Sequence, residues 1–171
     1  HLILFTKSRY ITLKFTSGTL PPSKILFDSL FIMDFLKRSR GPSHSLHIMS
    51  REFQRCPAYS DLLPYLCKYK HFVLHSLLLS PDDVIDFILM RLDAMTTSTF
   101  RDKRYYYELG MDSFINEARL LRIAETRFEV LPTRPQRTIR KLGTPFQAVF
   151  QQRRYDYHQA DYVEIEFKQA E

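Results

Sequence analysis

Three side chains that can bind a metal ion recur every four residues in the middle of the chain: Cys67, His71 and His75. On an α-helix this spacing would stack the thiol and the two imidazoles along one face, where they could form an open zinc site with three ligands. No glutamate accompanies the two histidines as in the helix of a zinc protease, and no second group of ligands is evident. The same positions fit the edge of a helix. We therefore favour a structural role and predict no metal and no cofactor.

Two pairs of carboxylates have spacings that could serve acid and base catalysis, Asp82 with Asp86 and Glu125 with Glu129. Each pair has a simpler role. Asp82 belongs to a helix cap, and the two glutamates lie among arginines at the spacing of surface helix pairs. No serine lies in a glycine-flanked elbow, so a serine nucleophile is not indicated either. We expect no catalytic residue and a protein that is not an enzyme.

The positive charge is concentrated at the start of the chain. Residues 1–55 hold nine Lys and Arg against three Asp and Glu, whereas the rest of the chain holds sixteen of each. No acidic residue precedes Asp28, which is typical of an organelle-targeting segment or of an arm on an anionic surface, although an ordinary basic tail fits as well. Two cysteines are too few for a secreted disulfide scaffold and fit a reducing compartment. No window holds the roughly 20 apolar residues that a membrane span needs.

Hydrophobic periodicity and chain breakers predict a mainly α-helical fold. The clearest signal is Ser80-Pro81-Asp82-Asp83, where Ser80 caps a helix and Pro81 occupies its first turn. Only four glycines are present, which also favours helices. The expected helices cover residues 23–37, 45–55, 60–77, 81–95, 101–110, 112–127 and 146–157, with Gly110 and Asp112 as caps, and the expected strands cover residues 11–15 and, at a sheet edge, 162–167.

These elements suggest an irregular domain of short helices with extended N- and C-terminal arms. We place a basic, acid-poor arm at residues 1–22, the helical domain at 23–128, and an extended C-terminal arm with one short helix at 129–171. Extended segments of this kind fold most readily against another molecule. Seven aromatic and arginine side chains are the expected interface anchors: Phe15, Arg101, Arg104, Tyr105, Arg137, Phe146 and Tyr155.

Basic and aromatic residues interleave at residues 101–107 and 153–155, a pattern that also suits RNA. Against RNA, residues 56–171 carry no net charge, and the acidic residues near the C-terminus would repel phosphates. Arginine and tyrosine are equally frequent at protein interfaces. An RNA-contacting mitochondrial ribosomal protein is therefore the alternative interpretation.

Residues 82–104 carry Asp83-Val84, then Arg91-Leu92, then Arg101 and Arg104. This order resembles the central helices of the small matrix-side subunit 7 (ubiquinone-binding-protein-like) family of the mitochondrial cytochrome bc1 complex. Leu131-Pro132 and residues 145–164 are similar in kind to that family's Leu-Pro turn and final charged helix. Asp93 stands where the family has proline, the stretch from Arg104 to Leu131 requires an insertion, and residues 1–55 have no counterpart.

The resemblance implies a helical subunit without a redox centre that packs on the matrix side of cytochrome b and the core proteins. Together with the acid-poor start and the missing catalytic set, it leads us to expect a non-catalytic accessory subunit of an inner-membrane respiratory complex, specifically complex III. Such a subunit would act in assembly and stability. Its partners would be other protein subunits, with peripheral lipid contact at the matrix side of the mitochondrial inner membrane.

Overall fold

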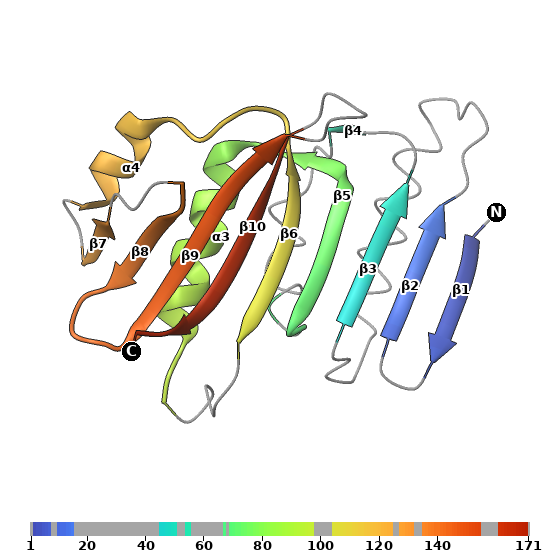
Figure 1. Ribbon diagram of the computed structural model, residues 1–171, viewed down its shortest axis with the longest axis horizontal. Helices are drawn as coiled ribbons and strands as arrows, with labels where there is room; N and C mark the ends of the chain where they lie inside the picture. Colours follow the sequence, from blue (N-terminus) through green and yellow to red (C-terminus); the bar gives the residue numbers. More distant parts are fainter. Residues whose placement is uncertain are drawn as a thin grey trace.

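The computed structural model describes residues 2–7, 10–15, 45–50, 54–55, 67, 69–97, 104–124, 127–131, 135–154 and 161–170. Within these residues the dominant element is a long mixed β-sheet (Figure 1). Nine strands follow one another across it in the order β1-β2-β3-β5-β6-β10-β9-β8-β7, and β4 pairs with β5 off this path. The expected mainly α-helical fold with two extended arms is therefore wrong.

The strands and helices have the following bounds. The strands are β1 (Leu2–Lys7), β2 (Tyr10–Phe15), β3 (Ser45–Ser50), β4 (Gln54–Arg55), β5 (His71–Leu79), β6 (Tyr105–Met111), β7 (Phe128–Leu131), β8 (Arg137–Lys141), β9 (Phe146–Arg154) and β10 (Asp161–Gln169). The two helices in the described part of the chain are α3 (Pro81–Ala94) and α4 (Glu117–Ala124). Neither is long and apolar enough to cross a membrane.

Apart from the edge strand β1, which pairs with β2 in antiparallel orientation, the sheet has a parallel half and an antiparallel half. Strands β2, β3, β5 and β6 run parallel, and α3 makes the crossover from β5 to β6. Beyond β6, the pairs with β10, β9, β8 and β7 are all antiparallel. Strand β10 lies between β6 and β9, so the strand expected at residues 162–167 exists, but its expected place at an edge is wrong. The strand expected at residues 11–15 is confirmed as β2.

Helix α3 forms where the cap signal predicts it. The Ser80 hydroxyl accepts a hydrogen bond from the Asp83 amide at 3.1 Å, and Pro81 opens the first turn. Its buried side holds Val84, Ile85, Phe87, Ile88 and Leu92. Phe87 packs edge-to-face on two rings of the sheet, at centroid distances of 5.1 Å to Tyr107 on β6 and 6.0 Å to Phe167 on β10. One helix therefore holds the core together across both halves of the sheet.

Four other expected helices are wrong because these segments pair with neighbouring strands of the sheet, where apolar residues can be buried with a period of two. The segments 45–50, 71–79, 105–111 and 146–154 are strands. In β9, for example, Phe146, Ala148 and Phe150 are buried at every second position. Gly110, expected as a helix cap, is a buried residue of β6. Residues 23–37, 60–66 and 155–157 of the expected helices lie outside the described residues.

The expected helix at residues 112–127 is shorter in the structure. Helix α4 covers only Glu117–Ala124, and the side-chain oxygen of Asn116, rather than Asp112, caps it by accepting from the Ala118 amide at 2.8 Å. Leu120 and Ile123 face the core. Arg119 holds α4 against the first turns of α3 through Asp82, at 3.1 Å, and Asp86, at 3.3 Å.

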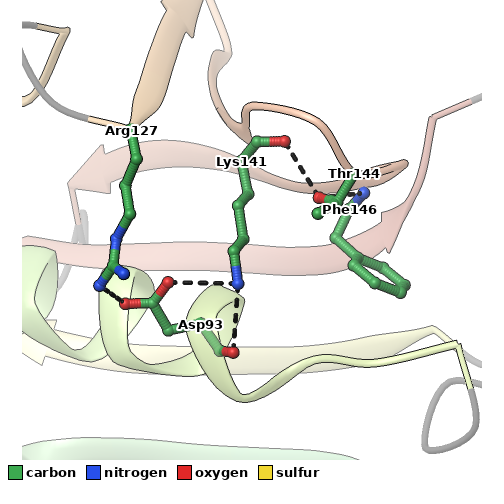
Figure 2. Close-up of polar contacts among 5 residues, drawn as sticks. All are labelled: Asp93, Arg127, Lys141, Thr144 and Phe146. Atoms are coloured by element: carbon green, nitrogen blue, oxygen red, sulfur yellow. Dashed lines mark hydrogen bonds and ion pairs between the residues drawn. The ribbon is translucent and has the colours of Figure 1, made fainter.

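The end of α3 is tied to the antiparallel half by Asp93 (Figure 2). Its carboxylate pairs with the Lys141 ammonium at 3.3 Å and with Arg127, which precedes β7. The same ammonium donates to the Asp93 carbonyl at 3.3 Å, where the negative end of the helix dipole favours a cation. Thr144 closes the adjacent β8–β9 turn by donating to the Lys141 carbonyl. One carboxylate thus positions three separate segments.

Replacing Asp93 with Asn should test this tie. The Asp93→Asn change leaves Lys141 and Arg127 close together without their common anion, so we expect the free energy of unfolding to fall by about 1–2 kcal/mol. The matched control is Asp86→Asn on the same helix, where the carboxylate is 64% exposed and the loss should stay below about 0.5 kcal/mol. Urea unfolding followed by circular dichroism measures both, and equal losses would contradict the role of Asp93.

Candidate protein-binding surface

The metal-ligand spacing does not produce the expected helical stack. Cys67 lies in a turn, and His71 opens strand β5. No group of three or more His, Cys, Asp and Glu side chains is placed to hold a metal ion within the described ranges. The side chain of His75 is outside what the structure describes. Cys67 and His71 therefore do not lie on one face of a helix, which was the basis of the candidate metal site.

Cys67 instead joins a packed cluster beside α3. It lies against the hydrophobic core, and burial raises the pKa of its thiol, while the charge and hydrogen bond of Arg91 act in the opposite direction. The Arg91 guanidinium stands 4.5 Å from the centre of the Tyr105 ring. The buried Tyr107 hydroxyl donates to the Tyr69 carbonyl at 2.7 Å, and burial raises the pKa of Tyr107. These contacts stabilise the core and do not prepare a nucleophile.

The carboxylate pairs have structural partners. Asp82 and Asp86 both bind Arg119, as described above, and so connect α3 with α4. Glu129 lies 3.8 Å from Arg140 on the neighbouring strand β8, and Glu125 is outside the described residues. In the described part of the chain, these carboxylates do not converge on a common space where a substrate could sit.

The seven expected interface anchors are scattered. Phe146 is only 3% exposed and belongs to the core, and Tyr105 packs partly buried against it. Arg104 is exposed and lies 3.5 Å from Glu166, whereas Arg137 is bound to Glu117 of α4. The side chain of Phe15 and the whole of Arg101 and Tyr155 fall outside the description. Among the residues that the structure describes, these anchors therefore do not form one surface.

A different surface, which we call the α4 surface, gathers exposed apolar side chains around α4. It consists of Phe114, Ala118, Leu121 and Pro135 together with the Glu117–Arg137 ion pair. Phe114 is 52% exposed and Leu121 is 69% exposed. A hollow of about 580 Å³ adjoins Phe114, and its lining residues are Phe114, Ile115, Glu117, Pro135, Arg137 and Gln152. Leu121 lies one helical turn beyond Glu117, so it continues the same row of side chains.

The frame beneath the α4 surface is fixed. The Ile115 amide donates to the Gln152 side-chain oxygen at 3.2 Å, and Ile115 itself is 7% exposed. Arg119 and Arg137 anchor α4 to α3 and β8 through their ion pairs. Phe114 and Leu121 are thus exposed on an anchored scaffold. The sequence holds one hint: Leu120 and Ile123 form the buried stripe of α4, which leaves Leu121 outside it.

Comparison with known proteins adds no further information about the site, because no protein-family model, curated protein or solved structure matches the chain. The candidate site is therefore described only by the geometry and exposure of the α4 surface. The α4 surface offers exposed Phe114 beside an open hollow, the Glu117–Arg137 ion pair among the residues that line this hollow, and exposed Leu121 one helical turn beyond Glu117.

Alkylation should show that Cys67 is a core residue. A raised pKa means less thiolate at about pH 8, so we expect iodoacetamide to modify Cys67 at least about tenfold more slowly in the native chain than in concentrated urea. Mass spectrometry of a Cys56→Ser variant isolates the signal of Cys67. An alkylation rate in the native chain equal to that in urea would show that the Cys67 thiol is not buried, and Cys67 would again be a candidate nucleophile.

Proposed function

We propose that this protein is a non-catalytic, protein-binding subunit of a larger assembly and that it contacts its partner through the α4 surface. The observation that carries the proposal is the exposure of Leu121 on α4 and of Phe114 just before it, because ion pairs and a buried face hold this helix in place. An apolar pair on a preorganised frame loses little conformational entropy when a partner covers it.

The two exposed side chains would supply part of the binding energy of this contact. Burying a fully exposed Phe or Leu contributes about 1.5–3 kcal/mol, so these two partly exposed side chains would contribute roughly 2–3 kcal/mol together. Glu117 and Arg137 line the same hollow as Phe114, so charged side chains lie beside the apolar anchor, as in interfaces where a few anchors dominate. The partner that fits is a protein segment with a bulky apolar side chain that can enter the hollow.

The identity of the assembly is a separate part of the proposal. An inner-membrane respiratory complex is the first assembly to test, supported by the acid-poor, basic residues 1–55. The sheet removes the helical body that favoured complex III in particular. The mitochondrial ribosome is the second assembly. Tyr106, one of the aromatic residues of the 101–107 segment, lies among Glu108, Glu164 and Glu166, whose charges disfavour phosphates there.

A double substitution tests the α4 surface. Phe114→Asp with Leu121→Asp should lower the amount of partner retained on the tagged chain at least about tenfold, because it removes the apolar anchors and adds charges that a partner would have to desolvate. Quantitative mass spectrometry after gentle purification from cells of the source organism measures this loss and identifies the particle, respiratory or ribosomal.

The matched control is Leu142→Asp. Leu142 is also 52% exposed but lies in the β8–β9 turn, away from the residues that line the hollow, so its substitution should leave the retained partner unchanged. Urea unfolding confirms that all variants remain folded. Full partner retention by the folded double variant, or an equal loss in Leu142→Asp, would refute the α4 surface.

A further inference from the structure

The face of the sheet turned away from α3 carries a second feature. Burial alternates along β10, where Val163, Ile165 and Phe167 point into the core while Tyr162, Glu164 and Glu166 lie on the other side. Of the described helices, α3 lies behind the sheet in the view of Figure 1 and α4 at its end, so neither covers this second side. We call it the open face.

Strand register brings two polar rows together at the centre of the open face. One row runs across β6, β10 and β9 as Tyr106, Glu166 and Val149. The next row holds Glu108, Glu164 and Gln151 on the same three strands. Glu108 and Glu164 are directly opposite each other, an arrangement of like charges that is unfavourable unless a cation is near.

A hollow of about 200 Å³ opens among these rows. Tyr106, Gln136, Val149, Phe150, Gln151, Glu164 and Glu166 line it. Among these described lining residues, the charged side chains are the two glutamates, which are 25% and 29% exposed. The volume is below the roughly 300 Å³ of an ordinary small-molecule pocket, which favours the insertion of a single side chain.

Three cations contact the two glutamates of this hollow at different distances. Arg153 donates to one oxygen of Glu164 at 2.8 Å from its exposed position on β9. The contacts of Glu166 are longer, 3.5 Å to Arg104 and 4.0 Å to Lys168, and Arg104 is 74% exposed. The negative field acts on Tyr106, where burial and then the neighbouring Glu108 and Glu164 raise the pKa of the phenol. The same field stabilises a cation.

We propose that this hollow accepts an arginine side chain from a protein partner. Carboxylates of Glu164 and Glu166 match the planar guanidinium, whose paired N–H groups bind carboxylates in parallel. The Tyr106 ring adds a cation–π surface, and Val149 provides an apolar contact for the methylene stem. Lysine fits less well, because its ammonium is a strongly hydrated point charge without a planar fork.

The proposed site goes beyond the α4 surface and is independent of it. Gln151 lines the hollow of the open face, whereas its neighbour Gln152 lines the hollow beside α4. Successive side chains of a strand point to opposite faces, so the two hollows lie on opposite sides of the sheet. Loss of one binding activity would therefore leave the other intact.

The test is an NMR titration of the full-length, ¹⁵N-labelled chain with Nα-acetyl-arginine amide. We expect saturable shifts of the backbone amides of Tyr106, Gln151, Glu164 and Glu166, with a Kd on the order of 1–10 mM for this minimal probe. The matched ligand is Nα-acetyl-citrulline amide, which has the same shape without the charge and should give no saturable shift.

Variants locate the binding. Glu166→Gln should weaken the arginine probe at least about threefold, and Glu164→Gln with Glu166→Gln at least about tenfold, because each change removes a charged acceptor and keeps the side-chain shape. The control Glu117→Gln, at the other hollow, should have no effect, and the spectra themselves show whether each variant is folded.

Equal binding of the citrulline probe would overturn the proposal. Unchanged affinity in the double variant, shifts confined to residues 114–121, or a lack of saturation at roughly 50 mM probe would overturn it as well.

Discussion

The packing of Phe87 between Tyr107 and Phe167 is the contact on which the rest of the fold depends. Tyr107 belongs to the last strand of the parallel half, and Phe167 to the first strand of the antiparallel half. These two rings are themselves 5.7 Å apart and edge-to-face, so three aromatic side chains from three elements meet at one point. Such rings contribute large buried areas and a preferred geometry, which fixes how α3 lies over the seam of the sheet.

Once α3 is fixed, both candidate sites follow. Arg119 of α4 forms ion pairs with the first turns of α3, and Lys141 and Arg127 form ion pairs with its last turn. The antiparallel half is therefore held at two places along one helix. The α4 surface is exposed because α4 uses its other side for this attachment. On the open face, the glutamates of β10 meet β6 and β9 only because the register on both sides is set by the buried residues between them.

The sequence predicted those elements whose signals are local. Helix α3 carries its own cap at Ser80 and Pro81, and the alternation of residues 162–167 is visible without knowledge of their neighbours. Strand β5 could not be recognised in this way, because Phe72, Val73 and Leu74 are buried in succession and show no period. Strand β6 could not be recognised either, because it begins with three consecutive tyrosines, of which only Tyr107 is fully buried. The two proposed binding surfaces depend on which strands become neighbours, and the local pattern of a single segment does not show that.

The position of β10 has a consequence for the synthesis of the protein. It is the last of the described strands along the chain, yet it fills the space between β6 and β9, and Phe167 pairs with Tyr105, 62 residues earlier. Until residues 161–169 leave the ribosome, β6 and β9 each lack a neighbour, and their unpaired edges can join other nascent chains. The closing of so long a loop is slow compared with local folding. A chain cut short before β10 would therefore leave the edges of β6 and β9 unpaired and open to aggregation.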